Sequence, residues 1–548
     1  MRKLKTNAQD TFRVKAYAGT NGVLLAFDVD ESRRNGLLGF AVKQKEGNKP
    51  WRWLLNSLTF PGKAHTIEKW QATPSNLAPI QKMRWADYSI EPRTTCRYRV
   101  HLVYGTPDLP QLDEDLEVEV RTDDGQPDNH RVIFNRAVAA SQAFGRKFED
   151  VDEWLSQNKN APIEDWPDPK ARDWLQHGLL DQIEKFVARA KDNTWTLDVA
   201  IYEYELAAIV KAINEAHKRG VKVRILYHGK LGDEQTRLNE ASVKKIPVAR
   251  KRARVTNKIF HDKFLVLGKL KNGVSEPRAV LCGSTNFTEN GVYRQANVVH
   301  VADDKAIAGL YAKLFQVVWD SPGDVPAAKK WIGLNNAIDA ANKMFVGFSP
   351  RAGGKDLAEF VNCINAADRD LLFATAFALP KNILEALLGQ DNDPVMRFGL
   401  QNSKSSITGF HADRTAKFVT PALLNKGLEG WVKEGLRGQK GNLLVHLKAI
   451  VVNFTSDDPI VISGSHNLSA SASSGNDENY LIMRGDTHLA DRYGLEILRF
   501  YEHYRFRYFA KLLKLKQARP LAIDGSWADG YYTNGSLKRL ERLHFAGR

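Results

Sequence analysis

The chain has 548 residues, of which 43% are hydrophobic and 26% charged, and its formal net charge is +15 at pH 7. This composition excludes a disordered or fibrous protein, and the length predicts several domains that each bury a core. The three cysteines are too scattered for a disulfide framework or a metal site. The basic charge is expected to attract polyanions, either nucleic acids or acidic membrane surfaces.

The N-terminal residues are basic, but no apolar stretch follows them, so they do not form a secretory signal. No apolar run approaches the length needed to span a membrane. These two features predict a cytoplasmic protein without a transmembrane segment.

In chain order, the first expected unit is an N-terminal antiparallel β-sandwich in residues 1–125. Apolar and polar residues alternate in 12–17, 23–29 and 97–104, a pattern typical of half-buried strands. Several such strands in this length indicate a fibronectin-like or immunoglobulin-like sandwich. Residues 126–168 are expected to form a linker with helical pieces.

Two α/β units are expected next, in residues 169–330 and 331–510. The elements predicted in the first are a helix at 175–190, a strand at 195–202, a helix at 206–218 and a strand at 221–227. This order is a βαβ unit, which implies a mixed or parallel sheet flanked by helices. The second unit repeats the scheme less clearly, and residues 511–548 form a basic C-terminal segment.

The most informative feature is an internal repeat. In each copy a His-x-Lys sequence leads into an apolar strand, and a second apolar strand then ends in Gly-Ser-x-Asn. The residues of the first copy are His261, Lys263, Ser284 and Asn286; those of the second are His446, Lys448, Ser465 and Asn467. The copies stay in register beyond the asparagine, where Gln295 and Asn297 correspond to Asn476 and Glu478.

The repeat predicts a site for a tetrahedral anion. Residues two apart in a strand point to the same face, so each histidine shares a face with its lysine. Two such sets facing each other would surround one point with two imidazoles, two ammonium groups and two amides. One imidazole can attack phosphorus and the other can protonate the leaving oxygen, while the lysines take the place of metal ions.

These residues resemble the paired HxK(x)4D motifs of the phospholipase D superfamily, and the resemblance covers about residues 170–510. It implies two pseudo-symmetric lobes with the active site at their seam, and a covalent phosphohistidine intermediate that water resolves. By this resemblance His261 is the nucleophile and His446 the general acid and base. Lys263, Lys448, Asn286 and Asn467 would hold the phosphoryl oxygens, Ser284 and Ser465 would support them, and Glu478 would orient the imidazole of the opposite motif.

Two departures from the motif bear on this interpretation. The motif aspartate is replaced by Gly268 in the first copy and by Asn453 in the second. The position that matches Glu478 is Asn297 in the first copy, so the lobes are not equivalent. If Glu478 orients one imidazole, the other imidazole lacks a carboxylate partner and is expected to be less basic.

Other residues are candidates for substrate binding. A basic run before His261 contains Arg252, Arg254 and Lys258, which either guide the substrate or form a solvated loop. His466, inside the second Gly-Ser-x-Asn, is either a substrate contact or structural. Gln295 and Asn297 are also expected near the substrate.

Three functions remain open. The preferred hypothesis is a metal-independent nuclease that hydrolyses DNA or RNA without any cofactor, since the basic charge suits nucleic acid. The first alternative is a phospholipase D or phosphatidyltransferase acting on phospholipids. The second is a binding or scaffold protein with a relict site. A single chain carries both motifs, so a monomer is expected to be catalytically sufficient, and a homodimer is compatible with that.

Overall fold

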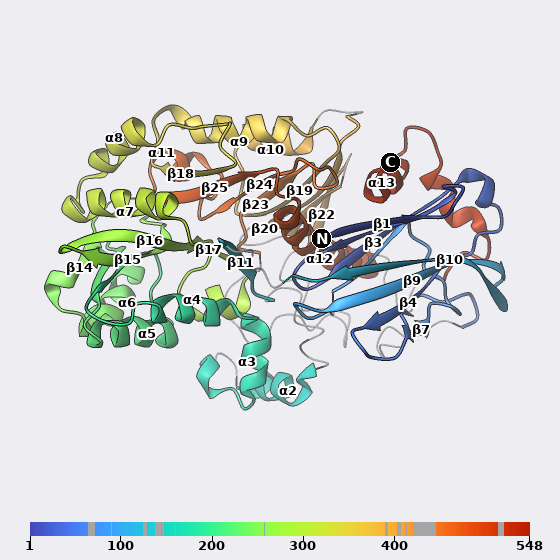
Figure 1. Cartoon of the computed structure of the whole chain (residues 1–548), viewed down its shortest axis with the longest axis horizontal. Coiled ribbons are helices and arrows are strands. Elements are labelled where there is room, and N and C mark those ends of the chain that lie inside the picture. The colour runs from blue at the N-terminus through green and yellow to red at the C-terminus, as the bar shows by residue number, and fades with distance from the viewer. Residues whose placement is uncertain are drawn as a thin grey trace.

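The computed structural model (Figure 1) covers the whole chain. The residues that it describes are all except 64–71, 89, 124–128, 137–143, 145–146, 159–160, 257, 390–392, 403–406, 412–413, 420–444 and 513–519. In the described part, no helix is both long enough and apolar enough to cross a membrane.

The N-terminal part is an antiparallel β-sandwich, as the alternating pattern predicts. One sheet has the order β1-β2-β3-β8 and the other β10-β9-β4-β5. The strands are β1 (Arg2–Thr6), β2 (Phe12–Ala18), β3 (Val23–Val29), β4 (Gly39–Glu46), β5 (Arg52–Trp53), β8 (Arg84–Asp87), β9 (Thr95–Thr106) and β10 (Leu109–Arg121). Inward-facing residues of both sheets share one core, in which the rings of Phe27 and Phe40 lie 4.5 Å apart. A small ribbon of β6 (Leu55–Asn56) and β7 (Thr73–Pro74) lies beside it.

The first lobe is a seven-stranded mixed sheet of order β11-β17-β16-β15-β12-β13-β14 with its helices. Its strands are β11 (His130–Phe134), β12 (Trp195–Ile201), β13 (Lys222–His228), β14 (Lys251–Arg254), β15 (Lys263–Lys271), β16 (Val274–Gly283) and β17 (Val298–Ala302). Its helices are α4 (Leu179–Ala188), α5 (Ala207–Lys218), α6 (Glu234–Ser242), α7 (Lys305–Asp320) and α8 (Val325–Asn335). The predicted βαβ unit is present as β12, α5 and β13, with β12 and β13 parallel.

Two details of the first lobe differ from the sequence-based expectation. The expected helix at 175–190 is two helices, α3 (Pro169–Gln176) and α4, because His177 and Gly178 adopt left-handed conformations with φ of 49° and 82°. The expected linker 126–168 contains α2 (Glu149–Gln157) and also β11, which pairs antiparallel with β17 and so belongs to the sheet. Val132 and Phe134 of β11 are buried, which the mostly polar sequence around them obscured.

The second lobe is an eight-stranded sheet of order β18-β25-β24-β23-β19-β20-β21-β22 with its helices. Its strands are β18 (Met344–Ser349), β19 (Asp370–Ala376), β20 (Met396–Asn402), β21 (Ile407–His411), β22 (Arg414–Val419), β23 (Ala449–Val452), β24 (Ile460–Gly464) and β25 (Glu478–Arg484). Its helices are α9 (Lys355–Asn365), α10 (Lys381–Leu388), α11 (Ala470–Ser474) and α12 (Thr487–Leu512). The pairing β25-β24-β23-β19-β20 repeats that of β17-β16-β15-β12-β13, so the lobes are pseudo-symmetric.

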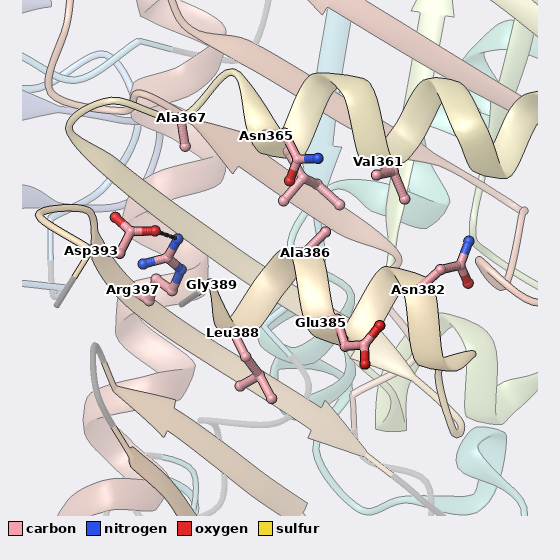
Figure 2. A pocket seen from close by; sticks show the side chains of 11 residues that line it. Val361, Asn365, Ala367, Asn382, Glu385, Ala386, Leu388, Gly389, Asp393 and Arg397 are labelled. Carbon is pink, nitrogen blue, oxygen red and sulfur yellow. Dashed lines mark hydrogen bonds and ion pairs between the residues drawn. The ribbon is translucent and has the colours of Figure 1, made fainter. Parts of the chain in front are cut away.

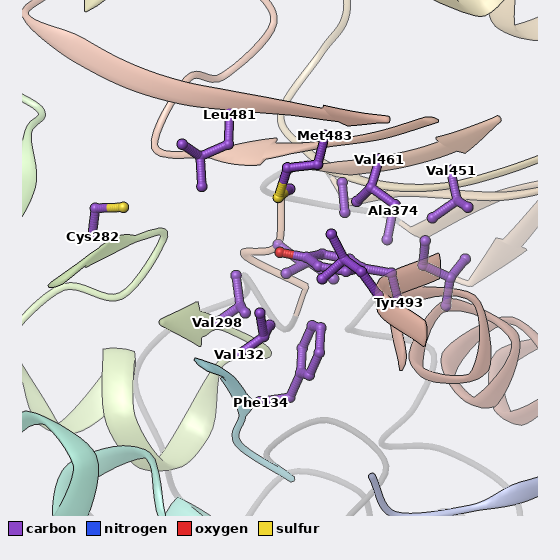
Figure 3. Packing of buried hydrophobic residues seen from close by; sticks show 14 of the residues in the cluster. Val132, Phe134, Cys282, Val298, Ala374, Val451, Val461, Leu481, Met483 and Tyr493 are labelled. Carbon is purple, nitrogen blue, oxygen red and sulfur yellow. The ribbon is translucent and has the colours of Figure 1, made fainter. Parts of the chain in front are cut away.

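The two sheets are stacked with a helical layer between them (Figure 1): α4 and α5 cover the outer face of the first sheet, and α9 and α10 the outer face of the second. The space between the sheets is a single apolar core formed by residues of both sheets, α7 and α12. Figure 3 shows Tyr493 of α12 in this core, beside Phe134 of the first lobe and Met483 of the second. The lobes therefore fold against each other.

The C-terminal segment packs mainly on the sandwich. Helix α13 (Leu537–Ala546) lies against β3, and Arg542 forms a buried ion pair with Asp28. The Tyr532 hydroxyl, which follows the 3-10 helix Gly525–Tyr531, donates to the Val29 carbonyl oxygen at 2.7 Å. Arg542 of the predicted basic segment thus serves packing, whereas Lys514, Lys516 and Arg519 lie outside the described residues.

Directly beside the seam, a buried ion pair connects the lobes. Arg254 of β14 donates from Nε and Nη2 to both carboxylate oxygens of Asp477, at 3.0 and 3.1 Å, and its side chain is fully buried. Its Nη1 donates to the carbonyl oxygens of Ser321 and Pro322. Bidentate geometry and satisfied donors are what a buried pair needs to be stable.

Replacing this arginine should destabilise the seam. Arg254→Ala leaves the Asp477 carboxylate buried without its partner and should lower the free energy of unfolding by about 3–5 kcal/mol. Arg252→Ala is the matched control. Arg252 is exposed and lies over the Trp319 ring at 4.8 Å, so its loss should cost only about 0.5–1 kcal/mol. Urea denaturation of both variants measures the difference, and equal effects would contradict the assignment.

Candidate functional site

The two His-x-Lys sequences lie at the start of equivalent strands. Lys263 begins β15 and His261 lies two residues before it, and His446 and Lys448 lead into β23. All four side chains are buried, with at most 4% of any of these residues exposed. The strand that follows each motif ends in a glycine at positive φ, Gly283 or Gly464, whose added Cβ would lie 2.2 or 2.5 Å from a carbonyl oxygen of the next strand. Only glycine fits there, which explains its place in both copies.

Each histidine is held by the opposite lobe. The backbone segment of His261 pairs in parallel with that of Asp477, and the His261 amide donates to the Asp477 carbonyl oxygen at 2.9 Å. The pseudo-symmetric pairing joins Ala296 to Val445, and the His446 amide donates to the Ala296 carbonyl oxygen at 3.2 Å. These crossed bridges bring both motifs of one chain to a single place.

The first imidazole is paired with a carboxylate. His261 Nδ1 lies 2.6 Å from Glu478 Oε2, and the Ser465 hydroxyl donates to the same oxygen at 3.0 Å. Asn476 adds an amide donor to the other oxygen at 3.3 Å. Because the carboxylate accepts, His261 carries its proton on Nδ1, and Nε2 keeps its lone pair.

The second imidazole is paired with an amide. His446 Nδ1 lies 2.9 Å from Asn297 Oδ1, which also accepts from the Ser284 hydroxyl at 2.8 Å. An amide oxygen only accepts, so His446 also carries its proton on Nδ1. Its Nε2 accepts from the Lys448 ammonium at 2.9 Å. The two histidines therefore have the same tautomer but different partners, and Asn297 orients an imidazole from within the protein.

Burial and the lysines dominate the electrostatics. Burial first, and then the charges of Lys263 and Lys448, hold the pKa of His261 well below its usual range, and the same groups lower the pKa of His446. Burial lowers the pKa of Lys263 to about 8, although the carboxylates of Glu478 and Glu203 oppose this shift. Burial raises the pKa of Glu478 to about 7. Each lysine acts on the histidine of the other lobe, so the groups form one cluster.

The two asparagines differ in their surroundings. Asn286 donates from Nδ2 to Glu203 Oε2 at 2.6 Å, and its own buried Oδ1 has no partner among the described residues. Within that same part of the chain, Asn467 Oδ1 is likewise buried without a partner. Glu203 was not predicted. The only signal for it was its position directly after a predicted strand that lies beside the His261 strand.

Aromatic rings close the site and were also not predicted as part of it. The Tyr202 ring lies 5.2 Å from the His261 ring, and the Lys263 ammonium lies over it at 5.3 Å. The Phe377 ring has the same relation to His446 and Lys448, at 6.4 and 6.0 Å. These rings lower the local dielectric and strengthen the electrostatic interactions of the cluster.

Several expected substrate contacts are engaged with other protein groups in the structure. Arg254 is committed to Asp477 and Arg252 to the Trp319 carbonyl oxygen and ring, so neither is free to guide a substrate. His466 faces Asp356, 3.3 Å from its carboxylate, and accepts from the Leu468 amide, which supports the structural alternative. Gln295 contributes its backbone carbonyl oxygen to Asn135 at 2.8 Å.

Lys258 is the member of the basic run that suits a substrate contact. It is exposed, and its carbon chain would lie about 3.2 Å from a Cβ added at Gly475, three residues before Glu478. Its stem therefore crosses the seam beside the residues that orient His261.

A pocket of about 810 Å³ lies away from this cluster, between α9, α10 and β20 (Figure 2). Arg397 on its floor is paired with Asp393, and Asn382 and Glu385 line its rim. It contains none of the residues of the repeat.

The buried cluster can bind and activate a tetrahedral oxyanion. Two Nε2 atoms with lone pairs, two ammonium groups and the Asn286 amide lie in one cluster, and the low dielectric strengthens each donor. No group of three His, Cys, Asp or Glu side chains in the described part of the chain is arranged to hold a metal ion.

Comparison with known proteins finds similarity for part of the chain. Residues 185–319 match the family model "Cardiolipin synthase, PLD-like domain". The chain is similar to the mitochondrial cardiolipin hydrolase of Drosophila melanogaster, with 28% identity over 161 residues, 26% of this chain and 60% of that protein. It thus spans about 60% of the length of this relative.

Two solved structures are also similar. The phosphatidylserine synthase of Haemophilus influenzae has 14% identity and a TM-score of 0.42, over 62% of this chain and 90% of that one. The phospholipase D family member Nuc of Salmonella typhimurium has 23% identity and a TM-score of 0.21, over 26% and 86%.

Proposed function

Because the chain belongs to the phospholipase D superfamily, we propose that it is a phosphodiester hydrolase that forms a covalent phosphohistidine at His261. The observation that carries the proposal is the tautomer of the two histidines. Each is held at Nδ1 by a residue of the opposite lobe, which leaves both Nε2 atoms for chemistry, and His446 Nε2 meets the Lys448 ammonium there. Nucleophilic attack and protonation of a leaving oxygen need two such nitrogens.

In the first step His261 Nε2 attacks phosphorus. The N–P bond forms as the bond from phosphorus to the leaving oxygen breaks, and the proton on His446 Nε2 passes to that oxygen. The Nδ1 proton of His261 stays in its hydrogen bond to Glu478, whose charge stabilises the imidazolium that develops. Lys263, Lys448 and the two asparagine amides stabilise the charge on the phosphoryl oxygens.

In the second step water replaces the histidine. His446, now neutral, accepts a proton from the water molecule, whose oxygen attacks phosphorus while the N–P bond breaks. A phosphomonoester leaves, and the proton gained by His446 restores the starting state. His446 must be protonated before the first step, and the negative charge of a bound phosphodiester raises its pKa from the low value that burial imposes.

For the substrate we propose nucleic acid. The formal net charge of +15 and the exposed Lys258 beside the seam favour a polyanionic chain. Phospholipid is the second candidate, because the matching family model and the Drosophila relative both carry cardiolipin in their names. A relict scaffold is not favoured, since both histidines and both lysines keep their mutual contacts.

The substrate is tested with single- and double-stranded DNA and RNA, and in parallel with cardiolipin-containing vesicles, all in excess EDTA. We expect cleavage of nucleic acid that persists in EDTA. His261→Ala and His446→Ala should each lower kcat by at least about 10³-fold, because each removes one of two groups that act as a unit. Cleavage of lipid alone would select the second candidate, and cleavage that EDTA abolishes would contradict the mechanism.

The role of the carboxylate is tested with Glu478→Gln. This change removes the charge that stabilises the His261 imidazolium, and kcat should fall by about 10²- to 10⁴-fold. Ser465→Ala is the matched control, because it removes one donor to the same carboxylate but keeps the charge. Its kcat should fall by no more than about 10-fold. The two rates are measured with bis(4-nitrophenyl) phosphate, and similar losses in both variants would exclude a charge effect.

A further inference from the structure

Glu203 is a carboxylate in the catalytic cluster that the mechanism does not use. It follows β12, is half-buried, and accepts from the Asn286 amide at 2.6 Å. Asn286 is one of the groups that the proposed function assigns to the phosphoryl oxygens. In the structure the Glu203 oxygen therefore takes the hydrogen bond that a phosphate oxygen would take.

The second lobe has no carboxylate at the matching position. Ala200 pairs with Phe264 in the first lobe, and Ala374 pairs with Ala449 in the second. By this register Glu203 corresponds to Phe377, which has no charge. The carboxylate is thus a special feature of the first lobe and not part of the repeated scaffold.

The charged groups around Glu203 indicate its role in the catalytic cluster. Lys263 of the same lobe and Lys448 of the other attract it, Glu205 on its own segment repels it, and Tyr202 lies next to it. Two ammonium groups then face two carboxylates, Glu203 and Glu478, while burial raises the pKa of the neighbouring Asp262 to about 8, so that its carboxyl is mostly neutral at pH 7. A phosphodiester adds a third negative charge to a buried site, which is costly unless one carboxylate becomes neutral.

Glu203 is the carboxylate that can become neutral without disturbing the histidines. Glu478 is hydrogen-bonded to His261, Ser465 and Asn476 and supports the nucleophile. Glu203 is hydrogen-bonded only to a neutral amide among the described residues. Once protonated, its hydroxyl can donate to a phosphoryl oxygen, so it changes from a competitor into a ligand.

We propose that Glu203 is an internal anion of the phosphate site, which competes with the phosphodiester for Asn286 and the two lysines and must be protonated before substrate binds. This assignment rests on the proposed function. Burial raises the pKa of Glu203 to about 7, against the opposing charge of Lys263, so the competition is weak at pH 6 and strong at pH 7.5.

The test is the binding of sulfate, a tetrahedral anion whose charge is constant in this range, measured by isothermal titration calorimetry at pH 6 and pH 7.5. Glu203→Gln should bind sulfate about 2- to 10-fold more tightly than the wild type at pH 7.5, because Glu203 is then mostly ionised in the wild type and only the protonated fraction is competent. At pH 6 the two proteins should agree. Loss of the Glu203 charge also lowers the pKa of Lys263. The resulting loss of ammonium charge weakens sulfate binding and so opposes the gain in affinity. This opposing effect is smallest at pH 6.

Two further variants complete the test. Glu203→Ala should behave like Glu203→Gln, and Glu234→Gln, which changes an exposed carboxylate of the same lobe, should match the wild type at both pH values. Equal or weaker sulfate binding by Glu203→Gln at pH 7.5 would overturn the proposal and make Glu203 a positioning residue for Asn286. If Glu203→Gln shows the predicted change in sulfate binding but the wild type hydrolyses no phosphodiester, the proposed function is overturned and the assignment of Glu203 stays intact.

Discussion

The hydrogen bond between Glu478 and His261 is the contact on which the rest of the site depends. It crosses from the second lobe to the first, so it exists only when the two sheets are stacked in one register. The apolar core around Tyr493 supplies the force for that stacking, and the Arg254–Asp477 pair fixes its position one residue from Glu478. Because Glu478 is fully buried, its charge acts on the imidazole with little screening by water.

The same burial forces the site to balance its charges. Two lysine ammonium groups are held beside two carboxylates, and both histidines are kept neutral. A resting site of this kind is stable because no buried charge is left alone. An incoming anion adds a negative charge to this site, which favours protonation of the ionisable side chains around it. Glu478 and Asn297 give the two histidines different partners, a carboxylate for His261 and an amide for His446.

Much of this arrangement could be predicted from the sequence because the motif occurs twice in the chain. Residues two apart on a strand share a face, so His261 and Lys263 could be placed together, and the recurrence with Gly-Ser-x-Asn indicated a second equivalent set. The alternating pattern also predicts the N-terminal sandwich. The site residues that the sequence did not reveal make contacts over long separations. Glu203 meets Asn286 83 residues away, and Arg254 meets Asp477 223 residues away.

The basic run before His261 shows most clearly what the sequence alone could not predict. Its charge suggested a path for the substrate, but charge alone does not tell a solvated arginine from one that is buried in an ion pair. Arg254 could be recognised as structural only once β14 and the segment before β25 were placed side by side. In the same way, β11 looked like linker because its strand partner, β17, lies far along the chain.

Nitrogen NMR of the protein labelled with ¹⁵N at histidine, assigned with His261 and His446 variants and followed from pH 5.5 to 8, tests directly whether each lobe orients the histidine of the other. The structure predicts that both imidazoles stay neutral across this range and that at pH 8, where the Glu478 carboxylate is ionised, each carries its proton on Nδ1. The His261 proton is then strongly deshielded by Glu478 and loses this shift in Glu478→Gln. Ordinary titration of His261 and His446 near pH 6.5, or an Nε2-protonated tautomer in either, would contradict a site in which each lobe orients the histidine of the other.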